Sequence, residues 1–464
     1  MTGVAHAETD LLTVYQQALE NDTQYKISEA NLRATEQGVR ISRSSLLPQI
    51  SGSASKQRRD FDNEGQGLDG SPSDPFNNRV DTTTLGVGLT QTLFDWSQWV
   101  ALDQAELRVR ASELNHAASL QSLMTRSAQA YFDVLAAEEN LETTQAELKA
   151  LKQQLDLTRE QYESGLANST DYLDAQANYD QSVANEVALQ NSLNIAQENL
   201  RELTGQYYMA LEGIGDNFTL SQPTPNNIDD WMRVAREENL GLKAQQMNVR
   251  VARKEVKRNR SGHYPTADLS INYSDSDSDT TRTFAQGISN QQFNPSLPED
   301  PNTNPRLSAP PGTVANSSAL SDGFSAQATL RVPIFSGFRT SAQTEQAKQN
   351  YLRSTHELEQ RDRLVQKSAR NAFTNLQSSI KSFEANKRAV ESSQSSLEAT
   401  QDGYQAGTRN IVDVLRSTRS LYSAKRSLTR AKYDYLLNSL RLKEAAGTLT
   451  EQDVQTINNW LNQY

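Results

Sequence analysis

The chain has 464 residues and contains no cysteine. Disulfides, thiolate metal sites and cysteine nucleophiles are therefore excluded, whatever compartment the protein occupies. Hydrophobic residues are also scarce, because they make up 36% of the chain and the mean hydropathy is -0.71. Such values are low for compact cores in a chain of this length. We therefore expect an elongated structure.

Long apolar runs are absent as well. No segment approaches the run of about 18 apolar residues that a transmembrane helix needs. Membrane insertion, if it occurs, would have to use strands. The 57 acidic residues outnumber the 46 basic ones and give a net charge of -11. This acidic excess argues against nucleic acid as a partner, because the phosphates of nucleic acid are also negative.

Proline is missing from two long spans, 76–222 and 334–464, whereas six prolines crowd residues 295–311. Proline removes a helical hydrogen bond and clashes with the preceding turn, so long helices fit the two proline-free spans. We predict outgoing helices over 97–163 and 338–405, each about 100 Å long at a rise of about 1.5 Å per residue.

The two spans also repeat one another. Residues 122–205 and 364–447 share a pattern at a shift of 242 positions, and the motif Tyr-x-x-Gly at Tyr162 returns at Tyr404. A fixed offset indicates one structural unit built twice. We predict four parts: a first repeat of a helix, two strands and a long helical hairpin (8–205), a linker (206–228), a second repeat (229–447) and a C-terminal helix (448–464).

Along the second span, positions at alternating spacings of three and four carry large apolar residues, except for the polar Lys387 and Gln394. The apolar positions are Phe373, Leu376, Ile380, Phe383, Val390 and Leu397. Sustained heptads of this kind predict coiled-coil packing of the helices. Each repeat should begin with one shorter helix, over 9–44 in the first and 231–262 in the second.

Four other segments alternate between apolar and polar residues, which is typical of strands with one buried face. They cover 49–56, 84–93, 267–273 and 324–334. Each is near the length of about 10 residues that a tilted transmembrane strand needs. Their connections over 60–81 and 278–320 are rich in polar residues, glycine and proline and are predicted to be irregular loops.

Four such strands cannot close a barrel, because about eight are the minimum and open edges are not tolerated in lipid. Three chains would supply 12 strands, an even number that suits an outer-membrane barrel. A soluble sandwich with one buried face is the alternative, but it explains neither the small polar residues of the opposite face nor the attached long helices.

Four aromatic residues flank the predicted strands: Trp96, Trp99, Tyr264 and Phe338. They suit a belt at the interface between membrane and water. Packing at the ends of the helices would explain them equally well.

Several ordered strings of residues resemble the TolC-type outer-membrane efflux proteins, over nearly the whole chain. They are Leu47-Pro48-Gln49, Gln91-Thr92-Leu93-Phe94-Asp95, the stretch from Tyr404 to Leu415, and Tyr433-Asp434-Tyr435. The resemblance implies an α+β fold in a homotrimer. A 12-stranded transmembrane β-barrel in the bacterial outer membrane, with four strands from each chain, would continue into a long α-helical coiled-coil barrel in the periplasm.

The same resemblance implies an exit duct for multidrug efflux, type I protein secretion or both. A periplasmic adaptor (membrane fusion) protein and an inner-membrane transporter of the ABC, RND or MFS class would dock at the closed end and open it. The substrates would be drugs, detergents or secreted polypeptides. The alternative is a periplasmic structural or adaptor coiled coil without a pore, which would need no amphipathic strands.

The start of the chain carries one further signal. Ala5-His6-Ala7 fits the small-x-small end of a secretory signal peptide. The mature chain would then begin near Glu8. An ordinary frayed N-terminus is the alternative.

Catalytic motifs are lacking. The four histidines are scattered, no histidine or carboxylate pair has metal-ligand spacing, and no phosphate-binding glycine loop occurs. Acidic neighbours such as Glu138 and Glu139 lie in a heptad helix and fit a solvated face. We therefore expect no enzyme, no cofactor and no metal, and the energy for transport would come from a partner.

The functional residues should lie at the two hairpin tips. Gly165 and Gly407 suit the left-handed position that follows a helix, and Ser169 and Asn410 suit N-caps. These assignments describe how the turns are built and hold for any function.

The resemblance also implies a periplasmic gate at the tips. Tyr404 and Arg409 would tie the inner hairpin to the outer one, with Asp171, Thr170 and Gln154 as their partners. A few such bonds, each about 1–3 kcal/mol when charge is involved, would form a latch that the docking of a partner could outweigh. Plain capping of the helix ends is the alternative.

Asp413 would, by resemblance, supply a three-fold ring of carboxylates at the constriction and draw in cations. Where the family often has a second acid one helical turn later, this chain has Arg416. The two residues are i,i+3 on one helix face, so Arg416 should partly neutralise Asp413. We therefore expect a weaker preference for cations than a double acid ring would give.

Overall fold

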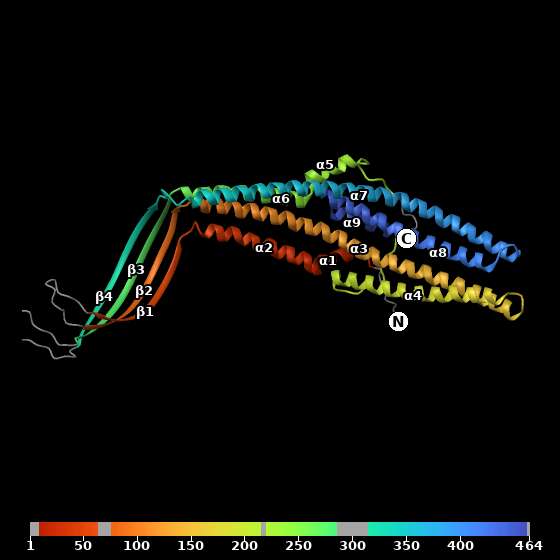
Figure 1. Ribbon diagram of the computed structural model, residues 1–464, viewed down its shortest axis with the longest axis horizontal. Coiled ribbons are helices and arrows are strands. Elements are labelled where there is room, and N and C mark those ends of the chain that lie inside the picture. The colour runs from red at the N-terminus through yellow and green to blue at the C-terminus, as the bar shows by residue number, and fades with distance from the viewer. Residues whose placement is uncertain (1–8, 64–75, 215–219, 285–313, 462–464) are drawn as a thin grey trace, which may run out of the picture. The chain divides into compact units, whose positions relative to one another are not determined.

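The computed structural model describes residues 9–63, 76–214, 220–284 and 314–461 (Figure 1). The elements in chain order are α1 (Leu11–Asn21), α2 (Thr23–Ser44), β1 (Gln49–Asn63), β2 (Phe76–Phe94), α3 (Trp96–Glu163), α4 (Ser169–Thr204), α5 (Ile228–Glu238), α6 (Leu240–Arg260), the 3-10 turn η1 (Ser261–His263), β3 (Thr266–Phe284), β4 (Val314–Arg331), α7 (Arg339–Gln405), α8 (Ile411–Ala446) and α9 (Glu451–Leu461). The signal-peptide residues Ala5-His6-Ala7 and the expected start near Glu8 lie outside the described residues.

The chain divides into two compact units, and each is described by itself. The helical unit comprises the residues up to Gly38, 104–253 and those from Lys348 onward. The strand unit comprises 39–103 and 254–347. The predicted repeats do not coincide with these units, because each repeat contributes residues to both.

The strand unit holds one antiparallel sheet in the order β1-β2-β3-β4 (Figure 1). Residues that lie directly opposite one another on neighbouring strands form rows across the sheet from β1 to β4, and the side chains of one row share a face. Three successive rows of one face are Ile50–Leu89–Ile271–Ala326, Gly52–Val87–Tyr273–Phe324 and Ala54–Leu85–Asp275–Asp322. The opposite face carries small polar residues and glycine, as in the row Ser51–Gly88–Asn272–Ser325. This alternation confirms the amphipathic strands that the sequence predicts.

Further along the same face, charged residues replace the apolar ones. Arg58 donates two hydrogen bonds to the directly opposite Asp81, at 2.8 and 3.1 Å. Arg79 donates one to the opposite Asp60 at 2.8 Å. One long face therefore has an apolar half near the start of β1 and a charged half beyond it.

The predicted strand lengths were wrong. The strands have 15, 19, 19 and 18 residues, so parts of the expected loops 60–81 and 278–320 belong to the sheet. The rest of those loops, 64–75 and 285–313, lies outside the described residues. At its other end β4 stops at Arg331 and not at Ile334, which fits Pro333, whose nitrogen has no proton for a sheet hydrogen bond.

The helical unit is built on long helices whose lengths the sequence predicted well. α3 has 68 residues and α7 has 67, and each is followed by a returning helix of 36 residues. The heptad residues Phe373, Leu376 and Ile380 are buried in one large cluster with residues of α1, α3, α8 and α9. The expectation of packed heptad helices is confirmed at these positions.

The single helices expected over 9–44 and 231–262 were wrong, because each is broken once. The breaks lie at Asp22 and Asn239, whose ψ angles of 120° and 118° are not helical. In both cases the side chain accepts a hydrogen bond from an amide three residues later, Tyr25 at 2.6 Å and Leu242 at 3.0 Å. An Asx side chain that caps the second helix therefore produces the same break twice.

Asp22 also forms an ion pair with Arg126 of α3, and the carboxylate of Asp22 is buried. Both of its oxygens accept from the Arg126 guanidinium at 2.9 Å. Burial alone would raise the pKa of Asp22, but the hydrogen bonds from Arg126 and from the Tyr25 amide outweigh it and hold the pKa below its usual value.

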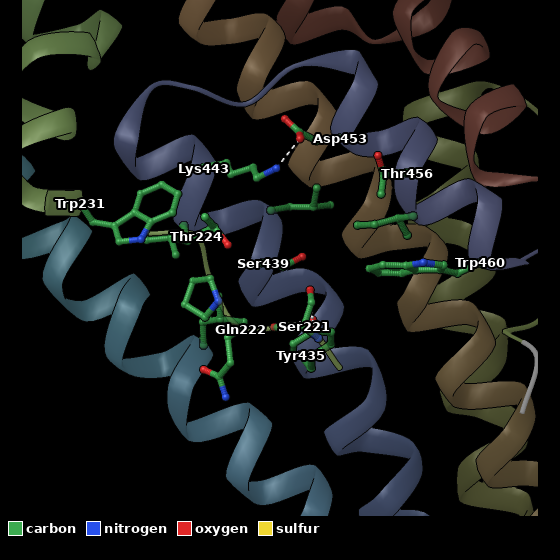
Figure 2. Close-up of a pocket in the computed structure, with 15 residues that line it drawn as sticks. Ser221, Gln222, Thr224, Trp231, Tyr435, Ser439, Lys443, Asp453, Thr456 and Trp460 are labelled. Atoms are coloured by element: carbon green, nitrogen blue, oxygen red, sulfur yellow. Dashed lines mark hydrogen bonds and ion pairs between the residues drawn. The ribbon is translucent and has the colours of Figure 1, made fainter. Parts of the chain in front are cut away.

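A cavity of about 240 Å³ lies in the helical unit, where the segment before α5 crosses α8 and α9 (Figure 2). The Tyr435 hydroxyl accepts from the Ser221 amide at 3.0 Å and donates to the Ser221 carbonyl at 3.1 Å. Lys443 and Asp453 form an ion pair at the cavity wall (Figure 2). These contacts fasten the segment to the helices.

The described residues contain no helix that is long and apolar enough to cross a membrane. Within the same ranges, no cluster of three or more histidine, aspartate or glutamate side chains could hold a metal ion.

Candidate functional site at the hairpin tips

The two hairpin tips have the same backbone design. After α3 the chain turns at Gly165, and after α7 it turns at Gly407, each with φ of 74°. The Gly165 amide bonds the Tyr162 carbonyl at 3.0 Å, and the next amide, that of Leu166, bonds the Gln161 carbonyl at 2.8 Å. The same two bonds recur from Gly407 and its successor. This is the Schellman end of a helix, which favours glycine because φ is positive, and both tip predictions are confirmed.

The N-caps that follow are only partly as predicted. Asn410 caps α8, because its side chain accepts from the Asp413 amide at 2.9 Å. The cap of α4 is Asn168 and not Ser169, which is the first residue of the helix itself. Asn168 has the extended backbone of a cap but makes no side-chain cap hydrogen bond.

The tips are held together by a small apolar cluster of their own. It joins Leu151 of α3 and Ala175 of α4 to residues of α7 and α8, among them Leu397, Val414 and Leu415. Tyr404 packs against this cluster and is half-buried. The two hairpins of one chain therefore contact each other close to their ends.

The Tyr404 hydroxyl makes a polar bond between the hairpins, but not to a predicted partner. It donates to Oε1 of Gln161 on α3 at 2.8 Å. In this single chain the bond that was expected to reach Asp171, Thr170 or Gln154 goes to Gln161. Thr170 is exposed and Asp171 is half-buried, both in the first turn of α4.

Gln154 lies on α3 between Leu151 and Leu155, which take part in the apolar cluster of the tips, and one of its polar groups is unused. Its Nε2 is buried and has no hydrogen-bond partner within the described chain, while its backbone carbonyl accepts from Thr158 at 2.7 Å. A buried amide without a partner costs free energy unless another group reaches it.

Arg409 reaches Asp413 instead of the other hairpin. Its guanidinium lies 3.9 Å from a carboxylate oxygen of Asp413, at i,i+4. Arg416 is exposed and makes no ion pair with any described residue. In the described chain Arg409, one turn earlier, lies closer to that carboxylate than Arg416 does. The partial neutralisation of Asp413 by Arg416 stays a prediction.

Further from the tips, an ion pair and a hydrogen bond connect α3 to α8. Arg426 lies 2.6 Å from the carboxylate of Glu147, which is buried. Tyr422 donates to the Ala146 carbonyl at 3.2 Å. Glu147 and Gln161 were not among the predicted site residues, although both lie seven residues from Gln154 on α3. Polar residues at heptad positions of α3 would have indicated these contacts in the sequence.

The four aromatic residues of the expected belt all lie in the strand unit and are exposed: Trp96, Trp99, Tyr264 and Phe338. Phe338 has a positive φ of 61°, unusual for a residue with a side chain, and its ring meets Phe335 edge-on at 5.4 Å.

A chain with long helical hairpins and a four-stranded sheet is also found among the solved structures. The crystal structure of the Campylobacter jejuni CmeC outer membrane channel matches with a TM-score of 0.75 at 16% identity, over 97% of this chain and 89% of that chain. At this identity the likeness shows the shared fold.

Sequence comparison identifies the family. The family described as outer membrane efflux protein matches residues 14–206 and 231–448. The outer membrane protein TolC of Vibrio cholerae serotype O1 is 36% identical over 97% of this chain and 93% of that protein. The proteases secretion protein PrtF of Dickeya chrysanthemi is 26% identical over 99% of this chain and 93% of that protein.

The chain therefore belongs to the outer membrane efflux protein family. It is a protein of the outer membrane that extends into the periplasm, and its family is one of channels rather than a class of enzymes.

Proposed function

We propose that this protein is the outer-membrane exit duct of an efflux and type I secretion pathway. The observation that carries the proposal is the open sheet: both edge strands, β1 and β4, are exposed along their described length. An open edge leaves backbone groups without partners, which lipid cannot satisfy. Three chains would close a sheet of twelve strands around a lumen lined by the small polar face.

The assembly and its boundaries belong to the same proposal. The exposed aromatic residues Trp96, Trp99, Tyr264 and Phe338 would sit at the membrane interface. The repeats 8–205 and 229–447, with the segment 206–228 between them and 448–464 after them, would each supply one pair of strands and one helical hairpin.

The hairpin tips would form the gate of the duct. Tyr404 joins the hairpins through Gln161, and Gln154 has an amide that a neighbouring chain could engage. Arg409, Thr170 and Asp171 lie at the rim of the two tips and would complete the latch between chains. Asp413 and Arg416 would face the constriction and set its ion preference.

The partners would be a periplasmic adaptor (membrane fusion) protein and an inner-membrane transporter of the ABC, RND or MFS class. Leu166 at the outer tip is 83% exposed and offers an apolar contact for such a partner. No group of this chain would perform catalysis, and the transporter would supply the energy.

A deletion strain tests the function most directly. It should become sensitive to drugs and detergents, or fail to release a type I substrate, and expression of the intact chain should restore either phenotype. Purified protein in a planar bilayer should conduct ions. A chain that restores neither phenotype and gives no conductance would contradict the proposed exit duct.

A further inference from the structure

The two edges of the sheet have complementary chemistry. On the face that carries the apolar rows, β1 presents Lys56 and Arg58. On β4 the same face presents Asp322, directly opposite Asp275 of β3. Two carboxylates opposite each other in a sheet repel, and no described residue forms an ion pair with either of them. A cation reaching Asp322 from beyond the β4 edge would relieve this repulsion.

We propose that β4 of one chain pairs with β1 of the next copy at an offset of four residues, so that Arg58 of the second copy lies opposite Asp322. This inference rests on the proposed closure of three copies and specifies how they join. Without any offset, the row through Asp322 would meet Ala54 of the next chain, because Ala54 is the β1 member of that row.

The geometry of a closed sheet limits the offset to a few values. It must be even, because an odd shift would move the apolar side chains of one strand to the polar face. Three seams each contribute the same offset to the total stagger. With strands about 4.8 Å apart and a rise of about 3.4 Å per residue, offsets of four and six tilt the strands by about 35° and 47°. Offsets of two and eight give about 20° and 55°, at least 10° beyond the usual range of about 35–45°, whereas an offset of four lies within it and an offset of six about 2° above it.

The direction of the offset follows from where the strands end. In one direction, an offset of four brings Gln49, the first residue of β1, opposite Arg331, the last residue of β4. In the other direction, Gln49 would lie opposite Gly323, and the last eight residues of β4 would have no partner. That loss falls beside the apolar rows, where lipid cannot satisfy the backbone groups.

The charges at the seam favour an offset of four residues over an offset of six. An offset of four places Arg58 opposite Asp322, while an offset of six places Asp60 there and sets a third carboxylate beside the first two. Arg58 already donates to Asp81 through its ε nitrogen and one terminal nitrogen. Its guanidinium has five N–H donors, so donors are left for Asp322 of the neighbouring chain.

Paired cysteines test the register, because the natural chain has none. Ser55→Cys with Ser325→Cys would lie directly opposite across the seam at an offset of four. Ser55→Cys with Gln327→Cys is the matched control, opposite only at an offset of six. Within one chain these positions are three strands apart, about 14 Å, too far for a disulfide. Any bond therefore joins two chains.

After mild oxidation we expect the first variant to run as a covalent trimer on a non-reducing gel, and the control to stay mostly uncrosslinked. Crosslinking of the control alone, or of neither variant, would overturn the proposed offset. The mass of both variants in detergent is measured in parallel. A mass of one chain would contradict the closure itself, whereas a trimer without the expected bond contradicts only the register.

The ion pair is tested by a double-mutant cycle with Arg58→Gln and Asp322→Asn, read as the temperature at which the trimer dissociates in detergent. Contact across the seam predicts that the two shifts are not additive. Arg79→Gln with Asp322→Asn is the control cycle and should be additive, since Arg79 already faces Asp60. Additive shifts in the Arg58 cycle would overturn the pair.

Discussion

The two units of this chain differ in how completely each buries its own side chains. The helical unit packs residues from α1, α3, α8 and α9 into one large apolar cluster, and many of its side chains are fully buried. In the strand unit most of the large apolar side chains of the sheet are exposed, and both edge strands are exposed along their described length. The helical unit therefore buries a large apolar core within one chain, whereas the strand unit needs lipid and further copies to cover its apolar face and its edges.

The largest difference in stability between the two units is expected when one tyrosine side chain is removed from each. Tyr435 in the helical unit is 1% exposed, and Tyr273 in the strand unit is 48% exposed. Tyr435→Ala should lower the free energy of unfolding by about 3–5 kcal/mol, because it leaves a cavity and frees the Ser221 backbone groups. Tyr273→Ala should cost much less.

Both variants are measured by thermal unfolding in the same detergent, followed by the helical circular dichroism signal. An equal loss of stability in the two variants would contradict the comparison between the units.

A second prediction concerns the buried ion pair at the break between α1 and α2. Asp22→Asn removes the charge from the bonds to Arg126 and should cost about 2–3 kcal/mol at pH 7. Glu29→Gln is the matched control, because its pair with Arg33 is exposed. Exposed pairs contribute at most about 1 kcal/mol.

The pH dependence of stability has a definite sign. The pKa of Asp22 is depressed in the folded chain, so its contribution is present above the unfolded value of about 4 and is lost as the pH falls through the folded value. The melting temperature of the natural chain should therefore approach that of Asp22→Asn as the pH is lowered from 5 toward about 2. A constant difference between the two would show that the pair does not titrate as described.

A third prediction addresses the contact between the hairpins at the tips. Tyr404→Phe removes the hydrogen bond to Gln161, a loss of about 1 kcal/mol or roughly fivefold in an opening equilibrium. Combined with Arg409→Ser, it should raise the single-channel conductance in planar bilayers while trimer stability changes little. Thr408→Ala is the control, because that hydroxyl donates to the Gly403 carbonyl within its own turn. If the double variant conducts like the natural chain, these residues merely cap the helices.

The smallest effect should be on ion selectivity. Arg416 is exposed near Asp413, so Arg416→Asp should increase the preference for cations, and Asp413→Ala should reduce it. The readout is the reversal potential under a salt gradient. If neither substitution moves it, the carboxylates do not lie at the constriction.

The helical unit was easier to predict from the sequence than the strand unit. The helices predicted over 97–163 and 338–405 start and end within one residue of α3 and α7. Absence of proline and the glycines of the tips are local signals, which makes such helices easy to find in a sequence. The breaks at Asp22 and Asn239 were missed, although both residues are good caps and lie at the same place in the two repeats. The apolar pattern continues across Asp22 and Asn239, so the pattern does not indicate that the helix ends there.

The strands were predicted too short for a physical reason. Beyond Leu85 and Tyr273 the face that should contact lipid turns to charged residues such as Arg58 and Asp279, so the alternation of apolar and polar residues ends while the hydrogen-bonded ladder continues. A pattern of hydrophobicity reports the depth of the apolar layer and not the length of the strand.

At the tips, the sequence predicted the glycine turns but not the contacts. Turn residues act through their own backbone, whereas the partner of Tyr404 depends on the register of α3 against α7. That register places Gln161, and not Gln154 one heptad earlier, against the hydroxyl. The resemblance to the family correctly identified Tyr404 as a residue that joins the hairpins, but it did not identify Gln161 as its partner.

The mass of the purified particle tests the central claim most directly, that the strand unit is completed by two further copies. Light scattering in detergent, corrected for bound detergent, should give three times the 51.7 kDa of one chain. A particle of one chain that keeps its sheet, or that stays soluble without detergent, would contradict it.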